Sequence, residues 1–334
     1  MREHNGDSIH LALIYKFTTG SIVFWLNVLL ITAATIFIAL VAVVYLAPNA
    51  VTDFALRAER RRCGLVRKEI ELTSGLHFAY LEGGAGETLM LLHGFGGNKD
   101  NFARVSRFLV KHYRVIVPDI VGFGESSHLM EADYSPPAQV DRLRAFAQAL
   151  GITQLHLGGN SMGGQIAMIY ASLYPTEVKS LWLLSPGGLL SAPKSDVFKT
   201  FVETGNNLLI VRTVEQFQQV MALGMEKRPW IPKPMLKVLA QERIQNAVLE
   251  AHIFRQIVDY PVEQQIDGMN TPTLVVFGDK DRVILVQTVD VLKKLLPHMS
   301  VRILSGVGHV PMFENARQCA QDYLLFRSSI RSME

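Results

Sequence analysis

Short apolar runs alternate with longer amphipathic segments along most of the chain beyond residue 66. Two of these runs, at residues 66–72 and 76–82, flank a Ser74-Gly75 turn and predict a hairpin. Further apolar runs predict strands at residues 88–92, 113–118, 155–158, 180–184, 273–278 and 301–305. Helical patterns fall between most of them, at residues 101–112, 138–150, 162–174, 286–296 and 313–330. Continuous apolar strands separated by helices predict an α/β fold with a mainly parallel sheet covered on both faces.

The alternation breaks once, between Gly187 and Met269. This segment is rich in Met, Phe, Gln and Leu, carries the sequence "RPWIPKP" at its middle, and shows helical patterns without a convincing strand. We interpret residues 188–269 as a helical cap, or lid, over the C-terminal edge of the sheet, where open α/β proteins bind their ligands.

An apolar run from Ile22 to Leu46 precedes this domain, and no charged residue occurs between Lys16 and Asp53. As a helix the run would be about 37 Å long, enough to cross a hydrocarbon core of roughly 30 Å with some tilt. We interpret it as an uncleaved transmembrane anchor, with a cleaved signal peptide or a buried core helix as the alternatives. The predicted organisation is an N-terminal segment (1–20), an anchor (21–47), a basic juxtamembrane linker (48–67), a core (68–187 and 270–334) and the cap (188–269).

The two flanks of the predicted anchor differ in charge. Two cations precede it and six follow it within about twenty residues: Arg2 and Lys16, then Arg57, Arg60, Arg61, Arg62, Arg67 and Lys68. The positive-inside rule places the following domain in the cytoplasm. The basic linker is either a surface that lies against anionic lipid headgroups or a solvated linker whose charges only enforce topology.

Composition excludes several other classes of protein. The chain is 49% hydrophobic and 19% charged, which is typical of a globular protein rather than a disordered one. Its net charge of +3, without a basic face or recognition motif, gives no argument for nucleic acid. Cys63 and Cys319 are the only cysteines, far apart and outside any Cys/His cluster, so no disulfide framework and no zinc site is expected.

The sequence "GNSMG" at residues 159–163 joins a predicted strand directly to a predicted helix. A turn this tight needs small residues two positions before and two after its central serine, as Gly159 and Gly163 provide. This is the G-x-S-x-G nucleophile elbow, which raises the serine oxygen above the sheet beside a helix N-terminus. The pattern predicts Ser161 as a nucleophile, and a purely structural Gly-rich turn is the alternative.

A serine nucleophile needs a base, and the base needs an orienting acid. His309, in "SGVGHVPMF", follows the last predicted strand and is the best candidate for the base. Asp279 and Asp281 both follow the strand at 273–278; Asp279 directly follows a glycine and is the better turn-former, so we favour Asp281 as the acid. His93 is expected to shape a loop and His156 to pack within a strand.

Five motifs in order, "LLHGFGG", "VPDIVGFGESS", "GNSMGG", "GDKDRV" and "GVGHVPM", make the chain resemble the α/β-hydrolases over residues 68–330. Within that superfamily it is most similar to bacterial cold-active triacylglycerol lipases and to membrane-anchored monoacylglycerol lipases. The resemblance implies the triad Ser161, Asp281 and His309, and an oxyanion hole formed by the backbone amides of Phe95 and Met162. Met162 opens a helix, so its amide is unpaired within that helix and available to an oxyanion.

The predicted activity is hydrolysis of carboxylic esters of lipids (mono-, di- or triacylglycerols) through an acyl-enzyme, without a cofactor, a metal or an obligatory protein partner. Membrane lipids and the lipid ester are the expected partners. Apolar residues of the predicted cap are candidates to line an acyl channel, with lid core as the alternative: Phe217, Met221, Met225, Trp230 and Ile231. Alternative functions are a short-chain esterase, a C–C bond hydrolase, a perhydrolase, or a non-catalytic ligand-binding member of the fold.

Overall fold

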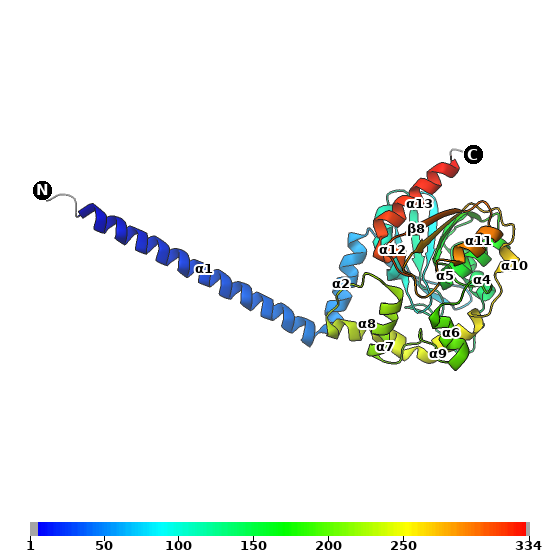
Figure 1. Ribbon diagram of the computed structural model, residues 1–334, viewed down its shortest axis with the longest axis horizontal. Helices are drawn as coiled ribbons and strands as arrows, with labels where there is room; N and C mark the ends of the chain where they lie inside the picture. The colour runs from blue at the N-terminus through cyan, green and yellow to red at the C-terminus, as the bar shows by residue number, and fades with distance from the viewer. Residues whose placement is uncertain (1–5, 332–334) are drawn as a thin grey trace.

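The computed structural model describes the backbone of residues 6–331 and the side chains of residues 22–330. Its first helix, α1 (Gly6–Leu46), projects from the rest of the molecule as a single long rod (Figure 1). The apolar run Ile22–Leu46 forms the C-terminal part of this helix. Arg2 and the first five residues of the predicted N-terminal segment lie outside the described residues.

Most of the predicted juxtamembrane linker is a second helix, α2 (Pro48–Arg62). Pro48 occupies its first position, where the missing N–H leaves no helical hydrogen bond unmade. The last turn carries Arg60, Arg61 and Arg62, whose positive charges favour the negative end of the helix dipole. Residues that seem on composition alone to form a linker therefore continue the chain as regular structure into the folded domain.

An eight-stranded sheet lies at the centre of that domain, in the order β1-β2-β4-β3-β5-β6-β7-β8. Strands β1 and β2 form the predicted hairpin and, like β2 and β4, pair antiparallel; all later pairs are parallel. The strands are β1 (Val66–Glu71), β2 (His77–Gly83), β3 (Thr88–Leu92), β4 (Arg114–Pro118), β5 (Leu155–Asn160), β6 (Val178–Leu184), β7 (Thr273–Gly278) and β8 (Ser300–Leu304). The predicted mainly parallel sheet is confirmed.

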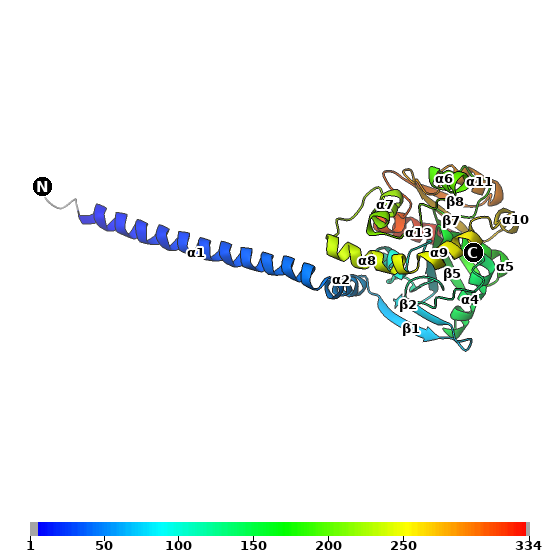
Figure 2. The same cartoon turned by 90° about the horizontal axis from the view of Figure 1, so that it is seen from below.

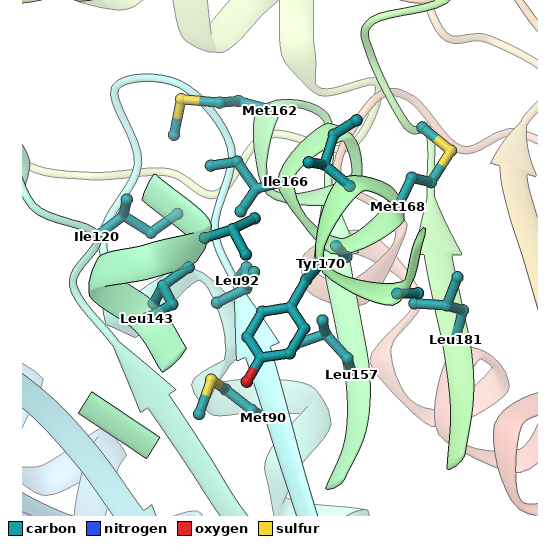
Figure 3. Close-up of a cluster of buried hydrophobic side chains, with 14 of the residues drawn as sticks. Met90, Leu92, Ile120, Leu143, Leu157, Met162, Ile166, Met168, Tyr170 and Leu181 are labelled. Carbon is teal, nitrogen blue, oxygen red and sulfur yellow. The ribbon is translucent and has the colours of Figure 1, made fainter. Parts of the chain in front are cut away.

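Successive residues of the central strands point to opposite faces of the sheet. Met90 and Leu92 of β3 pack on one side with α4 (Pro136–Ala149), α5 (Met162–Leu173) and α11 (Thr288–Leu295), in the cluster drawn in Figure 3. Leu89 and Leu91 pack on the other side with α3 (Ala103–Leu109), α12 (Pro311–Glu314) and α13 (Ala316–Arg331). The sheet is thus covered by helices on both faces, as predicted.

Between β6 and β7 the chain forms five helices and no strand, within the region where the sequence predicts a helical cap. The middle of this segment lies beside the C-terminal end of α1, whereas its end lies on the far side of the domain (Figures 1 and 2). The five helices are α6 (Asp196–Thr204), α7 (Val214–Gly224), α8 (Lys233–Gln245), α9 (Ala247–Ile257) and α10 (Glu263–Ile266). A short 3-10 helix, η1 (Lys99–Phe102), follows the loop after β3.

Candidate active site

Ser161 occupies a strained turn between β5 and α5. Its backbone has φ 54° and ψ −117°, a conformation that L-residues rarely adopt and that costs on the order of 1–3 kcal/mol. A Cβ added at Gly163 would lie 2.2 Å from the carbonyl oxygen of Leu92, and one at Gly159 would lie 2.1 Å from the carbonyl oxygen of Gly163. Neither position tolerates a side chain, so the two glycines permit the turn. This is the steric reason that the spacing of the glycines around Ser161 predicts.

His309 and Asp281 lie in the loops that follow β8 and β7, and their side chains are hydrogen-bonded. His309 Nδ1 lies 2.8 Å from Asp281 Oδ2, and both residues are buried. The other carboxylate oxygen, Oδ1, accepts hydrogen bonds from the amides of Val283 and Ile284, each at 2.9 Å. These two amides fix the plane of the carboxylate, which in turn orients the imidazole.

A buried amide side chain connects the histidine to the serine turn. Asn160, immediately before Ser161, donates through Nδ2 to the carbonyl oxygens of His309 and Leu184, each at 2.9 Å. The Ser161 amide also donates to the Leu184 carbonyl, at 3.1 Å. The structure therefore brings the serine turn and the His309 loop together at one edge of the sheet.

Asp279, the alternative acid, points elsewhere. Its Oδ1 accepts from the Gly306 amide at 2.7 Å, and its Oδ2 lies 3.3 Å from the Ser305 hydroxyl. It therefore closes the turn between the loops that follow β7 and β8. This is the turn-forming role predicted from its position directly after a glycine.

The loop that carries Phe95 passes directly beside Ser161. A Cβ added to Gly94 would lie 3.2 Å from Ser161 Cβ, so this glycine allows the loop its close approach. His93 is fully buried, accepts from the Ile120 amide through Nε2 at 3.0 Å, and donates through Nδ1 to the Gly94 carbonyl at 2.8 Å. Burial lowers the pKa of His93, which favours this neutral tautomer. His93 thus holds the loop in place, as its sequence position suggested.

Met162, the second predicted amide donor, is the first residue of α5. Its side chain is buried in the cluster of Figure 3. The packing of this side chain therefore holds in place the residue whose backbone begins the helix. The Phe95 ring makes edge-on contacts with Phe123 and with Phe254 of α9. Both predicted donors therefore belong to well-packed segments that flank Ser161.

Sequence reasoning missed a network of charges under the Phe95 loop. Lys99, which is 1% exposed, bonds Asp119 and Glu125, each at 2.7 Å. Arg60 of α2 bonds both carboxylate oxygens of Asp100 at 2.7 Å. Arg60 is thus buried against the domain, which corrects its assignment to a linker that is solvated or lies on headgroups. No local pattern could reveal a pairing between residues forty positions apart.

A cavity of about 270 Å³ opens next to the serine turn. Its wall includes Gly187, whose amide donates to the Ser161 carbonyl at 3.0 Å. Apolar side chains from the loop after β6, from α6 and from the loop after β7 line it, among them Leu189, Leu190, Phe198, Phe201 and Ile284. The lining of this cavity is therefore mainly apolar.

The five side chains predicted to line an acyl channel are absent from the lining of this cavity: Phe217, Met221, Met225, Trp230 and Ile231. Trp230 is 87% exposed, so its assignment to a channel wall is wrong. The error arises because the loop between α7 and α8 turns its tryptophan to the surface. The other four are partly buried, and their contact with substrate stays a prediction.

The end of α7 contacts the His309 loop directly. The Gly224 carbonyl accepts from the His309 amide at 2.8 Å. Glu314, of α12, accepts through Oε2 from the amides of Glu226 and Lys227 at 2.8 Å, and through Oε1 from the Gly308 amide at 2.9 Å. This part of the helical segment is thus fixed to the loop that holds the histidine.

Comparisons with known proteins agree with this geometry. The model of the alpha/beta hydrolase fold family matches residues 87–316. The chain is 45% identical to Lipase 1 of Psychrobacter immobilis, over 86% of this chain and 93% of that protein. It is 29% identical to monoacylglycerol lipase ABHD6 of Homo sapiens, over 74% of this chain and 77% of that protein.

A solved structure is similar over nearly the whole chain. The crystal structure of a membrane phospholipase A, described as a bacterial virulence factor, superposes with a TM-score of 0.82 at 36% identity and covers 91% of this chain and 99% of its own. The chain therefore belongs to the alpha/beta hydrolase family and is a carboxylic ester hydrolase.

Proposed function

We propose that the protein is a membrane-anchored serine hydrolase that cleaves carboxylic esters of lipids through an acyl-enzyme. The observation that carries this proposal is the constellation at the sheet edge. A strained, glycine-flanked Ser161 stands beside the loop of His309, and the His309 side chain is hydrogen-bonded at 2.8 Å to Asp281 of the loop after β7. This arrangement has the parts that serine acylation requires: a nucleophile, a base and a group that orients the base.

The proposed reaction has two halves. In the first, Ser161 Oγ attacks the ester carbonyl carbon while His309 Nε2 takes the hydroxyl proton. The tetrahedral oxyanion collapses, the alcohol leaves with that proton, and the acyl group remains on Ser161. In the second half, His309 removes a proton from water, which attacks the acyl-enzyme carbonyl; the bond to Ser161 Oγ then breaks, His309 returns the proton to that oxygen, and the acid is released. Asp281 holds the imidazole so that Nδ1 keeps its proton throughout.

The amides of Phe95 and Met162 are proposed to stabilise the oxyanion in both halves. Donors fixed in place before the reaction need no reorganisation, and each is worth about 2.7–4 kcal/mol at such a site. The close approach of Gly94 to Ser161 and the position of Met162 at the start of α5 support this assignment.

Lipid esters, with mono-, di- and triacylglycerols as the first choice, are the proposed substrates. The names of the relatives, a lipase and a monoacylglycerol lipase, support this class. The mainly apolar cavity whose wall includes Gly187 also supports this class, since each methylene buried in such a cavity would contribute about 0.8 kcal/mol. Catalytic efficiency is therefore expected to rise with acyl chain length.

Membrane anchoring is proposed to occur through α1. The run Ile22–Leu46 has a mean hydropathy of 2.7 and is 0% buried, which argues against the alternative of a core helix. The cations that follow it favour a cytoplasmic catalytic domain. A protease added to intact cells should leave the catalytic domain uncut and should cut it only after the membrane is permeabilised. Digestion of the domain in intact cells would show that it faces outward.

A chain-length series of esters, together with fluorophosphonate labelling, tests the function. We expect labelling of the wild-type protein, none of Ser161→Ala, and kcat/KM that increases from acetyl through octanoyl esters. Absent labelling in a folded wild type would indicate a ligand-binding role instead. A preference for acetyl esters that is lost at octanoyl would indicate a short-chain esterase.

A further inference from the structure

We propose that the loop between α7 and α8, residues 225–232, docks on the anionic lipid surface from which α1 emerges. We call it the Trp230 loop. The inference rests on the proposed membrane anchoring and adds a second, separate contact with the bilayer, made by the cap. Its three supports are the exposure of one aromatic side chain, the position of the loop and its charge.

The side chain of Trp230 is highly exposed, and exposure of so large an apolar surface to water is energetically unfavourable. Its side chain is 87% exposed although tryptophan is the largest apolar side chain. Pro229 and Pro232 flank Ile231 and Trp230, and their fixed φ angles restrict the backbone that presents the ring. Tryptophan is enriched where membrane meets water, because its ring is apolar and its N–H seeks a polar partner. A rigid loop with an exposed tryptophan suits that boundary.

The loop leads into the helix that lies against the anchor. Helix α8 contacts both α1 and α2. Figures 1 and 2 both show the start of α8 beside the C-terminal end of α1. If the run Ile22–Leu46 crosses the bilayer, Leu46 marks the depth at which the chain leaves the hydrocarbon. The loop therefore lies at the level of the headgroups.

Charge selects the kind of lipid. Lys227 and Arg228 in the loop and Lys233 directly after it are all exposed. The one acidic side chain of the loop, Glu226, lies 3.3 Å from Arg282, so it is already neutralised by a neighbour. Cations near an anionic surface contribute about 1 kcal/mol each. A second copy of the chain would bring like charges together, which disfavours it as the occupant.

The base of the loop is held by the active-site loops. The amides of Glu226 and Lys227 are bonded to Glu314, and Arg282 donates to the Ala222 carbonyl at 2.8 Å. Gly224, one residue before the loop, is bonded to the His309 amide. A bilayer in contact with Trp230 would thus contact the same cap segment that is bonded to the loop of the proposed base, His309. This arrangement suits a substrate that moves from the membrane to the active site.

Site-specific fluorescence on the full-length protein in vesicles tests the proposal. Trp230→Cys is labelled with an environment-sensitive fluorophore, which is selective because Cys63 and Cys319 are buried. The matched control is Leu173→Cys, which is 47% exposed at the end of α5, a helix that lies away from α1 in Figure 2. Vesicles of phosphatidylcholine alone are compared with vesicles that also contain phosphatidylglycerol.

We expect a blue shift and protection from iodide at position 230, more so with phosphatidylglycerol, and neither at position 173. Arg228→Gln and Lys233→Gln in the labelled protein should each lower the docked-to-free ratio about fivefold on anionic vesicles. Emission typical of water at position 230 would overturn the proposal. So would a blue shift that depends on protein concentration rather than on lipid, which would indicate a second copy. Fluorophosphonate labelling of the same samples reports the proposed function separately.

Discussion

The substitution Asp281→Asn offers a sharp test of the proposed triad, because the structure determines which way the new amide must face. Oδ1 of Asp281 accepts two backbone N–H donors, from Val283 and Ile284, at 2.9 Å. In the variant, the asparagine carbonyl oxygen has to occupy the position of Oδ1. In the opposite orientation the side-chain NH2 group, which can only donate, would face these two N–H donors. The NH2 group then faces His309 Nδ1, where Oδ2 now lies at 2.8 Å.

An NH2 group in that place can only donate, so it requires Nδ1 to be unprotonated and moves the ring proton to Nε2. An imidazole protonated at Nε2 cannot accept the proton of Ser161. The corresponding loss in serine proteases is about 10⁴-fold in kcat, which is about 5 kcal/mol of transition-state stabilisation. We expect a loss of this size here, with the fold intact.

The assay is steady-state hydrolysis of a water-soluble ester, with thermal unfolding as the check on the fold. Asp279→Asn is the matched control, because Asp279 bonds the Gly306 amide and the Ser305 hydroxyl rather than His309. It should lose far less activity. An Asp281→Asn enzyme within about tenfold of the wild type, or a larger loss in Asp279→Asn, would refute the tautomer argument.

Three further predictions follow from the same structure. Ser161→Ala and His309→Ala should each lower kcat by several orders of magnitude, and the double variant should be little worse than either, since the two act as a unit; additive losses in a kinetic comparison would contradict this. Arg60→Met should cost about 3–5 kcal/mol in denaturant unfolding because it leaves a mostly buried carboxylate unpaired, whereas the exposed Arg57→Met should cost under about 1 kcal/mol; equal costs would contradict the structural role of α2. Burial lowers the pKa of His156 to about 4, below its ordinary 6.5. The folded state then binds fewer protons than the unfolded state, so about 3 kcal/mol of stability present above pH 6.5 should be lost between pH 6.5 and pH 4, and His156→Gln should reduce this loss; an unchanged pH profile would contradict it.

The strands and the serine turn could be predicted because their causes are local. A strand buried on both faces reads as an unbroken apolar run, as at residues 88–92 and 273–278, and a tight turn demands glycines at fixed spacing. The choice of Asp281 over Asp279 also rested on a local property, the tendency of an aspartate after glycine to form a turn. The structure retains these features, and distant contacts such as that between Asn160 and the His309 carbonyl are compatible with them.

The features that could not be predicted depend on long-range partners. Arg60 looks like one cation of a basic linker, and only the position of Asp100 shows that it is buried. Likewise, an apolar helical pattern predicts that a side chain packs against apolar groups, but it does not identify those groups. The cavity of about 270 Å³ is lined in part by the loop after β6 and by α6, whereas the α7–α8 loop carries Trp230 to the surface.

Trapping of the acyl-enzyme tests the central claim most directly. The full-length protein is mixed with a monoacylglycerol or an activated ester of the same acid, quenched in acid within the first turnover, and weighed intact by mass spectrometry. We expect a mass increase equal to the acyl group, located by peptide mapping to Ser161, and no increase in Ser161→Ala. Turnover without an acylated intermediate in the wild type, or acylation of another residue at the same rate, would contradict the account.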